Sequence, residues 1–237
     1  MSSTKRVIVK LSGEALGGGG QVFDFNQTER AAKVLADVSR AGFEVGVVIG
    51  AGNIWRGRQG REMDAVTADQ MGMLGTVINC LMMAEAVRRQ GVRSRVMSAI
   101  EMPRVADVFH AGKAIEAMQA GEIVFFAGGS GNPFFTTDTA VVLRAVETKA
   151  DIILLAKNID GVYTADPRKD PGATLIRDIS YEEAGRRKLQ VMDTAAFALC
   201  AEQRVPQVRV FGLSEPENIL KVLNGDPMGT VLHPEND

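Results

Sequence analysis

The apolar residues of this chain fall into short continuous runs, each bounded by glycine or by polar residues. The runs are RVIVKL, EVGVVIG, RSRVMSA, EIVFFAG, DIILLAK and QVRVFGL. Runs of this length that do not alternate with polar residues are typical of strands buried on both faces. The pattern therefore predicts a set of buried strands.

Segments with helical spacing of apolar residues lie between these strands. They cover residues 27–40, 66–90, 111–120, 137–149 and 193–203. Buried strands that alternate with helices indicate a parallel sheet covered on both faces. We therefore predict an α/β fold, a three-layer sandwich with a mostly parallel central sheet, in a single domain of residues 1–237.

The longest predicted helix, 66–90, carries two apolar stripes. One stripe contains Met71, Leu74, Ile78 and Leu81, and the other contains Met73, Val77, Cys80 and Ala84. A helix that is apolar on two sides is buried on two sides. Two interpretations stay open with equal support: a central helix of the core, or a contact between subunits.

Composition narrows the class of protein. An apolar fraction of 46% and a charged fraction of 24% are ordinary for a soluble globular protein. A net charge of -2 argues against non-specific binding of nucleic acid. The longest uncharged run, 70–84, is too short to span a bilayer. We therefore expect a cytoplasmic protein without nucleic-acid or membrane partners.

The few cysteines and histidines exclude further classes. Cys80 and Cys200 lie in apolar helical segments, which favours buried thiols in a reducing compartment over a disulfide framework. His110 and His233 are far apart in the sequence, so neither a zinc site nor a Ser-His-Asp triad is attractive.

Lys10 interrupts the first predicted strand near its carboxyl end. Burying an ammonium group is costly unless it reaches water or an anion. Glycine turns follow this strand and two others, in LSG, GAGN and GGSGN. Such turns let backbone N–H groups approach an anion at the edge where α/β sheets bind ligands. One such turn is more simply a tight turn, but three at one edge favour a phosphate-rich ligand.

The common phosphate-binding fingerprints are missing. G-x-G-x-x-G would need glycine where Trp55 stands, and G-x-x-x-x-G-K-[ST] does not occur. A P-loop is therefore excluded, and Lys10 is the natural candidate for the phosphate-binding lysine. Arg56, after the second glycine turn, is a second basic candidate.

Several carboxylates lie near the same predicted edge. Asp69, Asp138 and Asp193 could each be a helix cap or a first-turn charge, and Asp160-Gly161 could be a turn. Capping is favoured for each one taken alone. For Thr136-Thr137-Asp138, capping and ligand binding are compatible.

At these residues the chain closely resembles the bacterial UMP kinases (uridylate kinases), which belong to the amino-acid kinase fold family. The likeness covers essentially the whole chain. It rests on VKLSGEAL, VGVVIGAGNIWRG, DQMGMLGTVIN, GSGNPFFTTDTA, DGVYTADPRKDP and VMDTAAF, of which GNPFFTTD and DGVYTADP together are highly specific. The resemblance implies an amino-acid kinase-like fold. It also implies transfer of the ATP γ-phosphoryl group to UMP, giving UDP and ADP, in pyrimidine nucleotide biosynthesis.

The resemblance further implies roles for individual residues. The catalytic residues would be Lys10, Arg56, Asp138 and Asp193, with Lys10 stabilising the moving charge and Asp193 orienting the lysines. ATP would contact Lys10, Leu11, Ser12, Gly13, Gly52, Arg56, Asn158, Tyr163 and Asp166. UMP would contact Ala51, Asp69, Ser130, Gly131, Asn132, Pro133, Phe134, Phe135, Thr136 and Thr137. Mg²⁺ would come with ATP, and the metal ligands stay unassigned.

Partners follow from the same resemblance: a homohexamer built from dimers, with GTP as an activator and UTP as an inhibitor. The chain departs from the family pattern at two places. Residues 17–20 are four glycines in the region that the family uses for GTP activation, and such a backbone is costly to order. Lys157 and Asn158 stand where related enzymes vary, so the adenine-side contact is fixed only to within a residue.

Three alternatives compete with this interpretation. A kinase of the same fold could phosphorylate a carboxylate or carbamate, such as acetylglutamate, but NPFFTTD argues against it. A catalytically silent nucleotide sensor would not need Lys10, Arg56, Asp138 and Asp193 together. A dinucleotide-dependent oxidoreductase is disfavoured by the failed glycine fingerprint.

Overall fold

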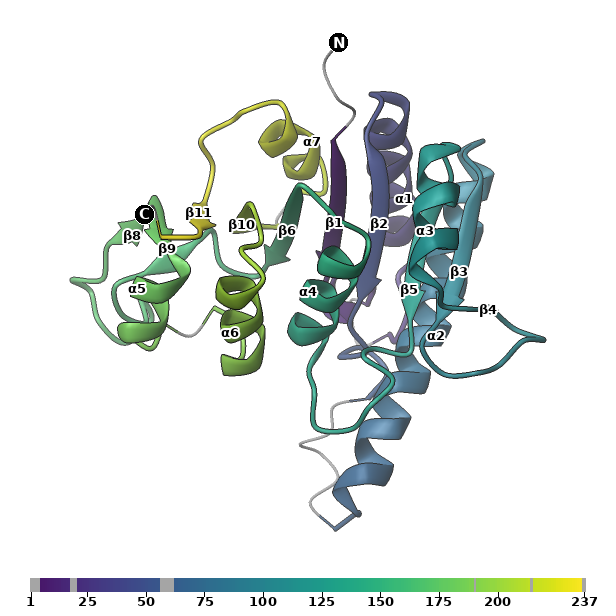
Figure 1. Cartoon of the computed structure of the whole chain (residues 1–237), viewed down its shortest axis with the longest axis horizontal. Coiled ribbons are helices and arrows are strands. Elements are labelled where there is room, and N and C mark those ends of the chain that lie inside the picture. The colour runs from purple at the N-terminus through teal and green to yellow at the C-terminus, as the bar shows by residue number, and fades with distance from the viewer. Residues whose placement is uncertain (1–4, 18–20, 56–61, 190, 214, 236–237) are drawn as a thin grey trace.

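A twisted sheet of nine strands forms the centre of the molecule in this computed structural model, which describes residues 5–17, 21–55, 62–189, 191–213 and 215–235 (Figure 1). Its strand order is β4-β3-β5-β2-β1-β6-β10-β11-β9. All neighbouring pairs are parallel except β10 with β11, so the predicted mostly parallel sheet is confirmed. The strands are β1 Arg6–Leu11, β2 Glu44–Ile49, β3 Ser94–Ser98, β4 Asp107–Val108, β5 Ile123–Ala127, β6 Ile152–Lys157, β9 Asp178–Ser180, β10 Val208–Gly212 and β11 Thr230–His233.

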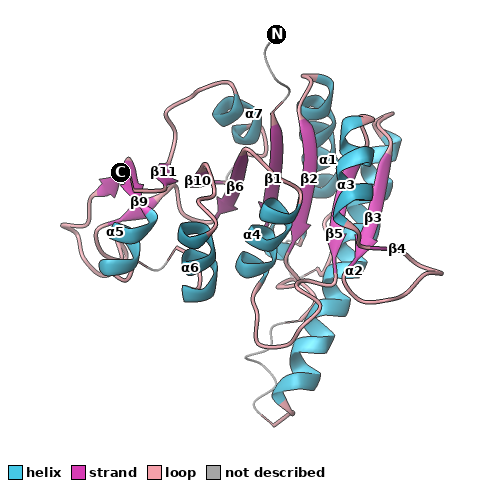
Figure 2. Cartoon of the chain, viewed as in Figure 1, coloured by secondary structure: helices cyan, strands magenta, loops and turns pink. Residues whose placement is uncertain are grey.

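Helices cover both faces of this sheet, which confirms the predicted three layers (Figure 2). One apolar cluster joins the sheet to α1, α2 and α7, and a second joins its other face to α3, α4, α5 and α6. The helices are α1 Phe25–Arg40, α2 Ala65–Arg89, α3 Ala111–Gln119, α4 Thr137–Glu147, α5 Tyr181–Arg186, α6 Thr194–Glu202 and α7 Asn218–Leu223, with a 3-10 turn, η1, at Gly13–Leu16.

A small hairpin stands outside the main sheet. Its strands are β7, Val162–Tyr163, and β8, Leu175–Ile176, and they pair antiparallel. The backbone N–H of Val162 donates to the buried hydroxyl of Thr230 at 2.8 Å, and that hydroxyl donates to the carbonyl of Ile176. Thr230, at the start of β11, thus fastens the hairpin to the edge of the sheet.

The pleat of β1 and β6 decides where their lysines lie. Val7 and Val9 of β1 belong to the cluster under α1 and α2, and Ile8 belongs to the opposite cluster. Because side chains alternate along a strand, Lys10 lies on the same face as Ile8, under α4. Lys157 ends the neighbouring strand β6 with the same alternation, so both lysines emerge on one face at the carboxyl edge.

The two apolar stripes of α2 have different environments. Val77, Cys80 and Ala84 are buried in the core. The other stripe is solvent-exposed in the single chain: Met71, Leu74, Ile78 and Leu81 are 37%, 49%, 47% and 36% exposed. The interpretation of a helix buried on both sides within one chain is therefore wrong. The helix extends past the carboxyl edge of the sheet, at the bottom of Figure 1.

α2 is also long and apolar enough to cross a membrane by length and composition alone. Of its most apolar window, 56% is buried inside the protein, as in the core helix of a folded domain. We therefore treat α2 as part of the core layer rather than as a membrane span.

Candidate active site

Three loops meet at the carboxyl edge of the sheet, as the glycine turns predict. A Cβ atom added to Gly50 would lie 3.4 Å from the backbone nitrogen of Gly13 and 3.6 Å from Oγ1 of Thr137. A Cβ atom added to Gly13 would overlap the carbonyl oxygen of Gly50 and the side chain of Asn53. Glycine at position 13 is thus required for the close approach of the first two loops.

A cavity of about 580 Å³ opens between α2 and the loop that precedes α4. Its lining is Ala51, Trp55, Ala68, Asp69, Gly72, Met73, Thr76, Gly129, Asn132, Phe135, Thr136 and Thr137. Six of these are predicted UMP contacts: Ala51, Asp69, Asn132, Phe135, Thr136 and Thr137. We call this space the acceptor cavity.

Asp69 reaches from α2 to the loop on the far side of the acceptor cavity. Its carboxylate accepts the backbone N–H of Phe134 at 2.7 Å. Phe134 has a φ of 71°, an uncommon conformation for a bulky residue, and is 73% exposed. The capping interpretation of Asp69 is wrong, because Asp64 caps α2 by accepting the N–H of Thr67 at 3.0 Å.

The rest of the predicted acceptor loop is braced internally. The hydroxyl of Ser130 accepts the N–H of Asn132 at 3.1 Å and donates to its carbonyl at 3.0 Å. Gly131 has a φ of 83°, which glycine adopts without strain. Ser130, Gly131, Pro133 and Phe134 adjoin the cavity in sequence but do not line it.

Two lysines share the carboxylate of Asp138, the residue that follows Thr136 and Thr137 of the acceptor-cavity lining. The Nζ of Lys10 lies 3.0 Å from Oδ1 of Asp138, and the Nζ of Lys157 lies 3.1 Å from Oδ2. Lys157 also donates to the backbone carbonyl of Val191. The side chains of Lys10, Asp138 and Lys157 are only 12%, 15% and 20% exposed, so these three charges interact largely away from bulk water.

The pKa directions in this cluster follow from burial and from the neighbouring charges. Burial alone would raise the pKa of Asp138, but Lys10 and Lys157 outweigh it and hold that pKa below the ordinary value of 3.8. Burial lowers the pKa of Lys157 below 10.5, and the neighbouring Lys10 adds to this effect while Asp138 and Asp193 oppose it. A phosphate group placed beside the two lysines would interact favourably with both ammonium groups.

Asp193 fixes the end of α4 that carries Asp138. It caps α6 by accepting the N–H of Ala196 at 2.8 Å, which confirms the capping interpretation. The same carboxylate accepts the hydroxyl of Thr139 at 2.9 Å and the hydroxyl of Thr136, the residue that caps α4. Asp193 therefore ties the N-termini of the two helices together.

The predicted ATP contacts divide between two places. Tyr163 and Asp166 line a cavity of about 1110 Å³ beside the β7–β8 hairpin. It shares Lys188, Leu189 and Val191 with a cavity of about 1250 Å³ that reaches the lysine cluster. We call these two spaces together the donor cavities.

Leu11 and Asn158 instead line a separate cavity of about 610 Å³ beside α1 and α7. The amide of Asn158 donates to Glu14 at 3.1 Å, and the hydroxyl of Ser12 caps η1. Gly52 lies in the second glycine loop, next to Gly13. Arg56 lies outside the described residues.

Lys157 is the chief site residue that the sequence analysis missed. It was mentioned there only as a neighbour of Asn158, the predicted adenine contact, and its ion pair with Asp138 was not predicted. The signal was available, because Lys157 ends an apolar strand two residues after the buried Leu155, as Lys10 follows Ile8. A lysine at the carboxyl end of each of two neighbouring parallel strands predicts a pair of cations on one face.

The described residues provide no cluster of three or more His, Cys, Asp or Glu that could hold a metal ion. The carboxylate of Asp138 is engaged by two lysines, and that of Asp193 is engaged by α6 and two threonines. Mg²⁺ commonly binds substrate phosphates and keeps several waters. The site thus fits a magnesium ion that enters as part of a nucleotide complex rather than one held in a protein cage.

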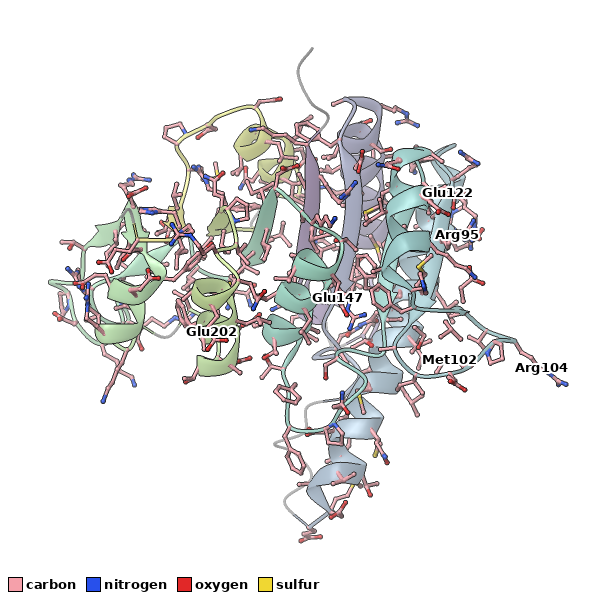
Figure 3. All side chains as sticks on the ribbon, in the orientation of Figure 1. Arg95, Met102, Arg104, Glu122, Glu147 and Glu202 are labelled. Atoms are coloured by element: carbon pink, nitrogen blue, oxygen red, sulfur yellow. The ribbon has the colours of Figure 1, made fainter. Side chains whose placement is uncertain are left out.

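Another group of charged residues lies at the β4 end of the sheet (Figure 3). There Arg95 pairs with Glu122 at 2.9 Å and with Asp107 at 3.2 Å, while Arg104 projects outward from a loop. Two carboxylates pair with Arg95 here, whereas Lys10 and Lys157 share the single carboxylate of Asp138.

The fold matches that of known kinases. The model of the amino acid kinase family matches residues 5–212. The chain therefore belongs to the amino acid kinase family. Its full-length relatives within that family include a uridylate kinase from a Nocardioides species, 47% identical over 235 residues, which are 98% of this chain and 99% of that protein.

Solved structures give the same result. The UMP kinase from Bacillus anthracis is 38% identical, with a TM-score of 0.92 over 98% of this chain and 97% of that one. The UMP kinase from Ureaplasma parvum is 34% identical, with a TM-score of 0.91 over 97% of this chain and 99% of that one. The resemblance predicted from the sequence motifs is confirmed.

Proposed function

We propose that this chain is a single-domain kinase that transfers the γ-phosphoryl group of ATP to UMP, giving ADP and UDP, for pyrimidine nucleotide biosynthesis. The observation that carries the proposal is the Lys10–Asp138–Lys157 cluster. Asp138 and Lys157 of this cluster line one donor cavity, and Asp138 directly follows Thr136 and Thr137 of the acceptor-cavity lining, in a chain that is similar along its whole length to a uridylate kinase.

The lysine cluster suits phosphoryl transfer because this reaction needs alignment and positive charge more than covalent chemistry from the protein. Lys10 and Lys157 would meet the oxygens of the phosphoryl group as it moves from donor to acceptor. Asp138 keeps the two ammonium groups in place without neutralising both. Mg²⁺ enters with ATP as part of the substrate and adds charge neutralisation on the phosphates.

The acceptor needs no general base, because the phosphate of UMP is already ionised at neutral pH. Asp69 has the position to accept the ribose hydroxyls from one wall of the acceptor cavity. Backbone N–H groups of the glycine loops near Gly13 and Gly52 can approach the phosphates closely. Catalysis would then follow from holding both phosphates in line.

The full site that we propose keeps the sequence assignments and adds one residue. Lys10, Lys157 and Arg56 supply positive charge, and Asp138 and Asp193 orient the lysines. The ATP contacts remain Lys10, Leu11 to Gly13, Gly52, Arg56, Asn158, Tyr163 and Asp166, and Lys157 is added beside Lys10 at the phosphates. The UMP contacts remain Ala51, Asp69 and residues 130–137.

A homohexamer built from dimers is the assembly that we propose. The exposed stripe of Met71, Leu74, Ile78 and Leu81 supports it, because a contiguous apolar helix face favours burial against another surface. Light scattering at micromolar concentration should give about six times the chain mass of 25.4 kDa. A stable monomer would contradict this assembly.

A cytoplasmic location, activation by GTP and inhibition by UTP complete the proposal. These regulatory effects rest on the family resemblance. The glycine loop assigned to GTP activation, 17–20, lies mostly outside the described residues. Initial rates with and without each effector would test the regulation directly.

An ATP-consumption assay tests the function. The purified chain is given Mg²⁺ and ATP with UMP, CMP, dUMP, acetylglutamate or carbamate in turn. We expect UMP to give the highest kcat/KM. Preference for a carboxylate or carbamate would make the chain a different kinase of the same fold, and activity with none of the acceptors would refute the proposal.

A further inference from the structure

Helix α2 braces two of the three glycine loops of the site from its inner face. Asn79 is fully buried, and its Nδ2 donates to the carbonyl of Gly50 at 2.7 Å and to Oδ1 of Asn53 at 2.8 Å. The Nδ2 of Asn53 donates back to Oδ1 of Asn79 at 3.1 Å. Every one of these bonds ends on the loop Gly50–Asn53.

Thr76 makes the matching contact with the other loop. Its hydroxyl accepts the backbone N–H of Gly128 at 2.8 Å and donates to the carbonyl of Met73 at 2.6 Å. Thr76 is 3% exposed and lies three residues before Asn79, so both side chains stand on one face of the helix. One rigid helix therefore holds two loops that come from different strands.

These polar side chains occupy positions where the core would favour apolar ones. A buried amide costs free energy unless its hydrogen bonds are satisfied, and their net contribution to stability is then modest. The loop that Asn79 holds also supports Gly13, since a Cβ atom there would overlap Gly50 and Asn53. A shift of Asn79 would therefore move the loop Gly50–Asn53 and, through it, the turn after β1 that contains Gly13.

We infer that Asn79 and Thr76 are positioning residues for phosphoryl transfer, which set the separation between the glycine loops on the two sides of the reacting phosphates. Neither side chain needs to touch the moving phosphoryl group. The inference rests on the proposed function, because the loops matter for rate only if they hold donor and acceptor phosphates.

The test compares substitutions along one helix. Asn79→Leu removes the amide at similar volume, Thr76→Val removes the hydroxyl, and Thr76→Ser keeps it. Val87→Ala is the matched control, because Val87 is buried on the same helix and belongs to the core cluster. Measurements on the full chain are kcat, KM for UMP and for ATP, melting temperature, and hydrogen exchange of the loop amides.

We expect kcat of Asn79→Leu to fall by about 10²-fold, the loss typical of reacting groups misplaced by about 1 Å. Both KM values should change by less than about three-fold, because the interaction acts on alignment rather than on ground-state binding. Thr76→Val should lose about ten-fold in kcat, and Thr76→Ser should recover most of it. Val87→Ala should lower the melting temperature while its kcat stays at the wild-type value.

Hydrogen exchange separates failure of the inference from failure of the proposed function. Amides 50–53 should exchange faster in Asn79→Leu than in Val87→Ala, whatever reaction the wild type catalyses. If the wild type does not phosphorylate UMP, the proposed function fails, and exchange alone then decides whether Asn79 holds the loop. A wild-type kcat in Asn79→Leu, or loop exchange equal to that of the control, would overturn the inference. If Asn79→Leu does not fold, the pair Thr76→Val and Thr76→Ser decides between the two outcomes by the same measurements.

Discussion

The acceptor cavity and the donor cavities are built differently. The acceptor cavity is walled by α2 and by loops that α2 holds through Asp69, Thr76 and Asn79. The donor cavities border the β7–β8 hairpin, which stands outside the main sheet and is fastened to it through Thr230. The contrast indicates an acceptor side that is preorganised by a long core helix, whereas the donor side is fastened near the edge of the sheet.

Preorganisation on one side has an energetic meaning. Ordering a loop when a ligand binds reduces affinity, and a loop already held by hydrogen bonds avoids that cost. We therefore expect substitution of an acceptor-side group that would contact UMP directly, such as Asp69, to affect selectivity for UMP. Substitutions in the lysine cluster should affect the rate of transfer itself.

The largest effect should come from Lys10→Met, which keeps the length and apolar packing of the side chain and deletes its charge. We expect kcat to fall by about 10²–10³-fold, the loss seen when one preorganised electrostatic group is removed. Asp138 keeps Lys157 as a partner, so the melting temperature should hold or rise. Wild-type kcat at saturating ATP would show that Lys10 is not catalytic.

Asp69→Asn should have the next largest effect and should act on the acceptor. A carboxylate accepts hydroxyl hydrogen bonds better than an amide, and the loss should be about 1.5–3 kcal/mol in UMP binding. Calorimetric titration with UMP and with ATP measures both affinities. If ATP binding weakens while UMP binding is unchanged, Asp69 belongs to the donor side, and its assignment to the acceptor cavity is wrong.

The pH dependence of kcat should reveal Lys157. Burial lowers the pKa of Lys157 below 10.5, so this lysine loses its proton at a lower pH than an ordinary lysine does. kcat should therefore fall by about ten-fold per pH unit as the pH rises through that lowered pKa. In Lys157→Arg the cation does not titrate, so the alkaline limb should move to higher pH. If the alkaline limb of the kcat profile is the same in Lys157→Arg as in the wild type, the group that titrates there is not Lys157.

The smallest effect should lie at the far edge of the sheet, next to the hairpin. The hydrogen bond to the carbonyl of Pro234 raises the pKa of His233, burial opposes it, and Asp178, whose Oδ1 is 2.9 Å from Nε2, adds to the rise. Because the folded pKa lies above the unfolded one, this stabilisation is fully present below about pH 6.5 and is lost as the pH rises through the folded pKa.

His233→Gln tests this edge. The change should destabilise the fold by less than about 1 kcal/mol at acidic pH, since the pair is partly exposed to solvent. At alkaline pH it should have little effect. Thermal unfolding at both pH values measures the difference, and an equal loss at both would exclude a charge on His233 as the cause.

The long elements of the fold were predictable from the sequence because their apolar patterns are strong. Six buried strands and five helices lie where the patterns place them, with ends that differ by one or two residues. The missed elements are short: β4, β7 and β8 have two residues each, β9 has three, β11 has four, and the helices α5 and α7 have six each. Elements this short are set by tertiary contacts, and no local period marks them.

The candidate site was predictable where residue type alone reports chemistry. Lys10 in an apolar strand and the glycine turns point to phosphate from their own sequence context. Asn79 and Thr76 look like ordinary interruptions of an apolar helix until the loops that they contact are known. Their importance depends on contacts to residues 29 and 52 positions away, and such contacts cannot be found from local spacing.

The central place of β1 has a consequence for synthesis of the chain. β1 pairs with β2 soon after it leaves the ribosome, but its other edge waits for β6, which begins at Ile152. Until then a chain with Lys10 in place has an open strand edge and no Lys157, Val191 or Asp193 to complete the site. Parallel pairing over such a separation is slow, and open edges aggregate. We expect a fragment that ends before Ile152 to associate through β1 in sedimentation experiments, whereas the full chain buries that edge as it acquires its active site.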